Sequence, residues 1–118
     1  MFTIKSTDIG DIGVSREVVE TLVGMAAIDC YGLVGMVAQD LQSGIVSILG
    51  IESVRKGVTV KSSDTGLIID VFVMVGYGIK IMEVAHSVMQ KVAYMLEEKA
   101  GLPVAAVNVN VRGVKVLG

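Results

Sequence analysis

The sequence has one cysteine, one histidine, one proline and no tryptophan among its 118 residues. The single cysteine, Cys30, excludes a disulfide within the chain and any zinc or iron–sulfur site built from several cysteines. The single histidine, His86, excludes a metal centre with several histidine ligands. The dinucleotide-binding fingerprint and the Walker phosphate-binding spacing are also missing. We therefore predict neither a metal site nor a cofactor site.

The sequence also lacks a long hydrophobic run and an excess of one charge. No stretch reaches the roughly 18 apolar residues of a membrane-spanning helix. The first residues, MFTIKSTD, lack the basic and apolar segments of a secretion signal, so we expect a cytoplasmic protein. Ten Lys and Arg against twelve Asp and Glu give a net charge of −2. Such a balance provides no general attraction to nucleic acid or anionic lipid.

What the chain has in excess is apolar side chains. Hydrophobic residues make up 53% of the sequence, above the roughly 45–50% of ordinary soluble domains. No proline-rich or serine-rich linker divides the chain. We therefore predict a single folded domain over residues 1–118, large enough for one hydrophobic core.

Two stretches show the apolar spacing of amphipathic helices. The first follows Ser15, a residue able to cap a helix, and runs over residues 16–31 before Gly32. The second covers residues 79–100. A shorter helix is predicted near residues 41–52. In the first helix, the residues predicted to be buried are Val18, Leu22, Met25 and Ala26, with Val19, Val23, Ala27 and Cys30 widening the same face. In the second helix, they are Ile81, Ala85, Val88, Val92, Met95 and Leu96.

The remaining patterns are typical of strands. Residues 56–61 and 67–75 flank the turn residues 62–66 and predict an antiparallel hairpin. Residues 104–114 alternate valines with polar side chains, and residues 33–37 fit a short strand. We predict an α+β fold whose main elements follow the order β-α-β-β-α-β, with a strand before the first helix. Two long helices would cover one face of a mainly antiparallel sheet in a two-layer sandwich.

Two apolar surfaces have no assigned cover in this arrangement: residues 44–51 and one side of the strand at 67–75. Asp70 lies on that side and is expected to face solvent opposite a lysine. Exposed apolar surface often marks an interface, although the 44–51 segment could equally close the end of the core. The candidate interface residues are Ile45, Ile48, Leu49, Ile51, Ile68, Asp70, Phe72, Met74, Asn108, Asn110 and Arg112.

Other chemistry has weaker support. His86 lies within a predicted helix, Cys30 lies on an apolar side, and no nucleophile-elbow motif is present, so we predict no catalytic residue and no enzyme. An alternative function is nucleic-acid binding, because Gly32-Leu33-Val34-Gly35 is similar to the backbone-clamping loop of KH domains. The basic residues available at the strand ends are Arg55, Lys56, Lys61, Arg112 and Lys115.

An ordered series of short motifs covers nearly the whole chain: GVS at 13–15, EVV at 17–19, YGLVGM at 31–36, KGV at 56–58, VGYG at 75–78, GLPV at 101–104 and VNVNV at 107–111. The series resembles the alkaline shock protein family of Gram-positive bacteria, also called envelope stress response proteins. The chain is most similar to short, single-domain members without charged extensions.

The resemblance implies a small, non-enzymatic cytoplasmic protein in cell-envelope homeostasis or stress response. It implies self-association into homo-oligomers, contact with paralogues, or attachment to the inner face of the membrane through a membrane-anchored partner protein. It implies no catalytic residue.

Overall fold

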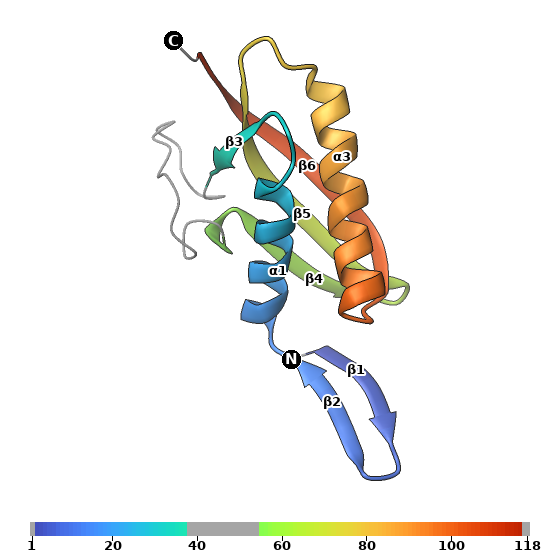
Figure 1. The fold of residues 1–118 in the computed structure, drawn as a ribbon. Coiled ribbons are helices and arrows are strands. Elements are labelled where there is room, and N and C mark those ends of the chain that lie inside the picture. The colour runs from blue at the N-terminus through green and yellow to red at the C-terminus, as the bar shows by residue number, and fades with distance from the viewer. Residues whose placement is uncertain (1, 38–54, 117–118) are drawn as a thin grey trace.

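The computed structural model describes residues 2–37 and 55–116, which form a sheet layer and a helix layer (Figure 1). The helices are α1 (Arg16–Ile28) and α3 (Ile81–Tyr94), and α3 continues into a π-helical turn, η1 (Met95–Lys99). The strands are β1 (Phe2–Thr7), β2 (Gly10–Val14), β3 (Leu33–Met36), β4 (Val58–Ser63), β5 (Gly66–Gly76) and β6 (Val104–Lys115). The α+β prediction is confirmed. The helix expected near residues 41–52 lies outside the described residues.

Strand β5 is the centre of a four-stranded sheet. One of its edges pairs antiparallel with β4 and, near the other end, with β3. The other edge pairs with β6 over nearly the full length of β5, and this pairing is parallel. The predicted hairpin is therefore present as β4 and β5. The parallel pairing arises because α3 carries the chain back along the sheet before β6 begins, as in a β-α-β crossover.

An N-terminal hairpin forms a second small sheet where the predicted order has a single strand. Strands β1 and β2 pair antiparallel and project away from the start of α1 (Figure 1). Phe2 and Ile4 are half-buried and pack against the main core, whereas Ile9 in the turn is 99% exposed. The Thr7 hydroxyl donates to the carbonyl of Gly10 at 2.8 Å and closes the turn.

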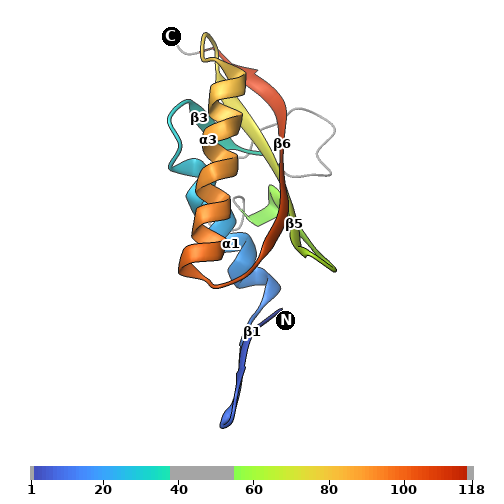
Figure 2. The same ribbon diagram turned by 90° about the vertical axis from the view of Figure 1, so that its right-hand side faces the viewer.

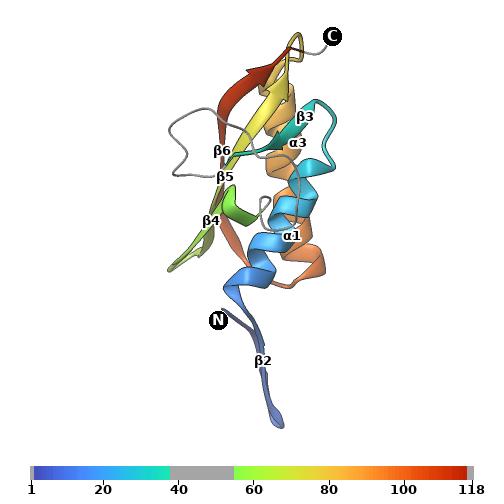
Figure 3. The ribbon, with the colours of Figure 1, turned by 90° about the vertical axis from the view of Figure 1, so that its left-hand side faces the viewer.

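The core lies between the helices and one face of the sheet. Seen from the side, both helices lie on the same side of the four-stranded sheet (Figures 2 and 3). Alternation along β5 directs its aliphatic residues to this side. The innermost residues are Leu67, Ile69, Val71, Val73 and Val75 of β5, Val19 and Val23 of α1, and Val84, Val88, Val92 and Leu96 of the second helix and its extension.

The helices bury most of the residues predicted to face the core, but not all of them. Val18 and Met25 are 47% and 49% exposed, while Val19, Val23 and Ala26 are buried. In α3, Ile81 is 44% exposed and Val84 lies in the core instead. Both helices are apolar over more than one stripe, so local spacing alone did not decide which stripe faces the sheet.

The predicted ends of the first helix are nearly correct. The Ser15 hydroxyl accepts from the backbone N–H of Val18 at 3.3 Å, which confirms the cap. The helix ends at Ile28, a few residues early, and Gly32 then takes a left-handed φ of 91°. A Cβ at this glycine would lie 2.7 Å from Ile79 and 2.8 Å from Val84, so the turn requires glycine.

Candidate interaction surface

The side of the sheet turned away from the helices carries the described part of the predicted interface. We call this side the second face. Its members come from the alternate positions of β5 and from β6, which the register of the parallel pair brings side by side. They are Ile68, Asp70, Phe72, Met74, Asn108, Asn110 and Arg112. The other predicted residues, Ile45, Ile48, Leu49 and Ile51, lie outside the described residues.

Asp70 is at the centre of the second face. Its register neighbours are Thr59 on β4 and Asn108 on β6. One carboxylate oxygen accepts from Asn108 Nδ2 at 3.0 Å, and the other accepts from Thr59 Oγ1 at 3.4 Å. The prediction of a lysine opposite Asp70 is wrong, because Lys61 lies opposite Ile68. This half-buried carboxylate is held by two neutral donors that fix its direction.

Arg112 extends the same surface along β6. Its guanidinium carbon lies 4.9 Å from the centroid of the Phe72 ring, within cation–π range. Phe72 is only 6% exposed, whereas Arg112 is exposed. Asn110, the register partner of Phe72, donates from Nδ2 to the carbonyl of Val71 at 3.4 Å. The second face therefore presents a cation, amides and a carboxylate in fixed positions above apolar side chains.

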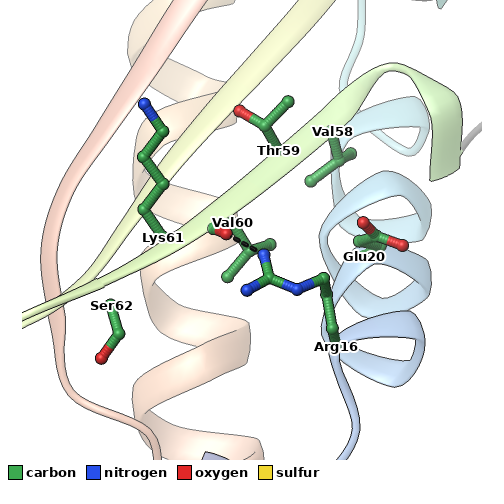
Figure 4. A pocket seen from close by; sticks show the side chains of 7 residues that line it. All are labelled: Arg16, Glu20, Val58, Thr59, Val60, Lys61 and Ser62. Carbon is green, nitrogen blue, oxygen red and sulfur yellow. Dashed lines mark hydrogen bonds between the residues drawn. The ribbon is translucent and has the colours of Figure 1, made fainter. Parts of the chain in front are cut away.

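A different contact occupies the β4 edge of the sheet. An open cleft of about 600 Å³ lies between α1 and β4 and is lined by Arg16, Glu20, Val58, Thr59, Val60, Lys61 and Ser62 (Figure 4). Within it, the Arg16 guanidinium donates to the carbonyl of Val60 and also lies over the Phe2 ring. Arg16 thus connects α1, the N-terminal hairpin and an edge carbonyl. No sequence signal indicated this role, because the partner is 44 residues away.

Of the two ion pairs in the helix layer of the described residues, one joins the two helices. Lys91 Nζ of α3 lies 2.5 Å from Asp29 Oδ2 at the end of α1. The hydrogen bond and the charge of Lys91 lower the pKa of the Asp29 carboxyl, and the same contact raises the pKa of Lys91. Next to this pair, burial raises the pKa of the Cys30 thiol. Cys30 is buried as predicted, and its sulfur lies 3.6 Å from the carbonyl of Ala26.

The nucleic-acid alternative depended on a glycine loop that the structure does not form. Residues Leu33–Met36 are strand β3, and Gly35 within it is buried. Gly32 is packed against Ile79 and Val84. A clamp for a nucleic-acid backbone needs accessible amides in a loop. The expectation of a KH-like loop at Gly32–Gly35 is therefore wrong.

Two kinds of feature are missing from the part of the chain that the structure describes. Across residues 2–37 and 55–116, no group of three or more His, Cys, Asp or Glu side chains is placed to hold a metal ion. In the same residues, no helix is both long enough and apolar enough to cross a membrane.

Comparison with known proteins gives a consistent result. Residues 4–116 match the model of the alkaline shock protein family, which is described by a "cell envelope-related function". The uncharacterized protein YloU of Bacillus subtilis (strain 168) is 42% identical over 111 residues, covering 93% of this chain and 92% of YloU. The uncharacterized protein Spy1614 of Streptococcus pyogenes serotype M6 is 39% identical over 118 residues, covering 98% of each chain.

A solved structure titled MamM-CTD is similar in fold. Its TM-score is 0.50 with 12% sequence identity, over 88% of this chain and 100% of that one. At this identity the similarity concerns the α+β architecture alone. Neither the family description nor the names of these relatives give an enzymatic activity.

Proposed function

The chain belongs to the alkaline shock protein family, whose function is related to the cell envelope, and from this premise we propose that it is a non-enzymatic protein-interaction module. It acts as one domain over residues 1–118, in the cytoplasm at the inner side of the envelope. Its contacts are with other copies of itself, with paralogues or with a membrane-anchored protein. The ordered motifs of the sequence support the same role.

The second face is the observation that carries the proposal. Protein interfaces combine an apolar centre with polar groups whose hydrogen-bonding positions are fixed. Ile68 and Met74 are half-buried here, and Phe72 lies beneath Arg112. Asp70 is oriented by Asn108 and Thr59 before any partner arrives. A preorganised polar group costs little conformational entropy on binding.

The mechanism is protein–protein contact without chemistry. A partner buries the apolar residues of the second face, which drives association. Asp70, Asn108, Asn110 and Arg112 set specificity, because a partner without matching donors and acceptors would leave buried polar groups unpaired. We propose Arg112 as the main charged determinant, since it is exposed and reaches over Phe72.

A charge reversal on the second face tests this proposal. The unmodified chain and the Arg112→Glu variant are used to capture proteins from a membrane fraction of the source cells after crosslinking. Lys99→Glu is the matched control, because Lys99 is exposed on η1 in the helix layer. We expect Arg112→Glu to lose the captured proteins and Lys99→Glu to retain them. Equal capture by all three chains would contradict the role of the second face.

A further inference from the structure

The outer edge of β6 differs from the centre of the sheet in its burial. In the described chain, β6 pairs with β5 on one side and with no strand on the other. Ile69, Val71 and Val73 of β5 are 0% exposed. Their register partners on β6, Val107, Val109 and Val111, point to the same side of the sheet and are only half-buried. The helix-facing valines of β6 are thus left incompletely covered.

The neighbouring flank of α3 is also apolar. The ion pair of Lys91 with Asp29 marks the flank of α3 that faces α1. Helical spacing places another row on the opposite flank, alongside β6 (Figure 2). Its members are Met82, which is 73% exposed, and Ala85, Met89 and Ala93, which are half-buried. We call the valines of β6 together with this row the apolar border.

We propose that β6 pairs antiparallel with β6 of a second copy of this chain, across a two-fold axis at Val109. This inference deepens the proposed function and rests on it for the biological need to self-associate. The pairing gives the outer backbone N–H and C=O groups of β6 partners, which an unpaired edge strand lacks. It also buries the apolar border against its own copy, as a two-fold interface requires.

The register follows from the residue pattern of β6. Two residues that lie directly opposite each other in an antiparallel pair of strands point to the same face of the sheet. To keep the helices of both copies on one face, valines must therefore lie opposite valines and asparagines opposite asparagines. An axis at Val109 places Val107 opposite Val111 of the second copy and Asn108 opposite Asn110. If the register between the two copies shifted by one residue, the asparagines of one copy would point to the same face as the helices of the other. An axis at Asn108 or Asn110 would keep the faces but leave one valine without a valine partner.

The charges of β6 are compatible with this arrangement. Arg112 and Lys115 both lie in the C-terminal part of the strand. With the axis at Val109, Arg112 lies opposite the small side chain of Ala106 and roughly 20 Å along the strand from its own copy. The two basic ends therefore do not meet. The pairing also brings the two second faces edge to edge, so Asn108 of one copy continues the polar row of the other.

The opposite edge of the sheet is less suited to such pairing. Strand β4 is shorter than β6. At the β4 edge, the Arg16 guanidinium already donates a hydrogen bond to the carbonyl of Val60. A strand added at this edge would have to displace Arg16 from its contact with Phe2 as well. These contacts favour β6 as the edge that accepts a second copy.

Site-directed crosslinking tests the proposed register in the full chain. In Val109→Cys the two new thiols would lie directly across the axis, where antiparallel Cα atoms are about 4.5–5.5 Å apart, within disulfide range. In Val107→Cys and Val111→Cys each thiol would be roughly 13 Å from its own copy, beyond that range. The native Cys30 is buried, and the unmodified chain gives the background.

We expect the disulfide-linked dimer to form under mild oxidation in Val109→Cys and to remain near background in the two control variants. The unmodified chain should be a dimer by light scattering, and Val109→Glu should be a folded monomer by light scattering and circular dichroism. Maximal crosslinking at another β6 position would contradict the axis at Val109. A monomer at every concentration, without preferential crosslinking at this position, would overturn the dimer.

The dimer and the proposed function fail in different ways. A monomeric chain that still captures membrane-fraction proteins through Arg112 would overturn the dimer and support the proposed function. A dimer crosslinked at Val109 that captures nothing would support the dimer and contradict the capture role of the second face. If Val109→Glu removes a captured protein from a chain that is already monomeric, β6 pairs with a different protein and the self-pairing is wrong.

Discussion

Strands β5 and β6 both direct every second residue, an aliphatic one, towards the helices, but their surroundings differ. On the other side β5 is mostly apolar with Asp70 as its one polar residue, whereas β6 carries Asn108, Asn110 and Arg112. Val71 and Val109 are direct register partners, yet Val71 is 0% exposed and Val109 is half-buried. The difference comes from position in the sheet, because β5 has neighbours on both edges and β6 has a neighbour on one within the described residues.

This comparison shows where the excess of apolar residues goes. The fully buried valines of β5 belong to the core of one copy, where close packing makes the free energy of unfolding sensitive to each methyl group. The half-buried valines of β6 contribute less to that core and remain available for contact with a second copy. The same strand pattern therefore serves folding in β5 and, in our proposal, assembly in β6.

The largest expected effect separates these two roles with one matched pair of variants. Val71→Ala removes fully buried methyl groups and leaves a cavity, so we expect the free energy of unfolding to fall by about 2–3 kcal/mol. Val109→Ala should cost about half as much in dilute protein. Urea denaturation at low and high protein concentration checks both values. The cost of Val109→Ala should grow with concentration, since the dimer couples association to folding. Equal losses of the free energy of unfolding for the two variants at all protein concentrations would contradict the different roles of β5 and β6.

The next effect concerns the polar row that joins the strands. Asp70→Ala removes the acceptor for Asn108 and Thr59, and we expect a loss of about 1 kcal/mol in the free energy of unfolding. Asn108→Ala should cost less, because Asn108 is exposed and water can replace its hydrogen bond to Asp70. Urea midpoints of the two variants give the comparison. A larger loss for Asn108→Ala would show that the edge strand carries the stabilising contact.

A smaller effect is expected for the cation over Phe72. Arg112→Met keeps an apolar chain of similar length and removes the charge, so the free energy of unfolding should fall by about 0.5–1 kcal/mol. Arg112→Lys should recover part of the loss. Thermal denaturation followed by circular dichroism is sufficient. If Arg112→Met is as stable as the unmodified chain, the stacking does not stabilise the fold, and Arg112 is available for partner contact alone.

The smallest effect is expected from the ion pair on the α1 side of α3. The pKa of Asp29 is lowered in the folded chain, so its contribution to stability is present above the ordinary carboxyl pKa and is lost as the pH falls through the lowered value. The pKa of Lys91 is raised, so its contribution is lost only as the pH rises through the raised lysine value. Asp29→Asn should therefore lower the melting temperature slightly at neutral pH.

The acid range provides the control for this prediction. The melting temperatures of Asp29→Asn and the unmodified chain should converge in strong acid, where Asp29 is protonated in both the folded and the unfolded state. The dimer measured by light scattering should be unchanged, because Asp29 lies at the end of α1 and contacts α3 on the flank away from β6. A difference that persists at low pH, or a change in the dimer, would contradict the division of α3 into two flanks.

Much of the fold was predictable because its signals are local. The Ser15 cap, the β4–β5 hairpin and the alternation of β6 depend on residues close together in the chain, and the structure confirms all of them. The pairing of the N-terminal segment into a hairpin was not predicted because Ile9 is fully exposed at its turn and the two strands contain no fully buried residue. A hairpin with little burial leaves a weak periodic pattern.

The sequence predicted which β5 residues share the second face, but it did not predict the contacts that they make. Alternation placed Asp70 and Phe72 on one side of the strand, and the structure agrees. The lysine expected opposite Asp70 was wrong because cross-strand register is set by the hairpin turn, which places Thr59 there. The interface role of these residues remains a prediction.

The amino-acid sequence alone determined the types of the main elements and the side of each strand that is apolar, since both depend on periods of 2 and 3.6 residues. Only the tertiary structure decided that β6 runs parallel to β5, that Val84 rather than Ile81 faces the sheet, and that Arg16 reaches Val60. These outcomes depend on segments far apart in the chain. Their positions are set by how two helices and a sheet pack together, and no local pattern encodes that choice.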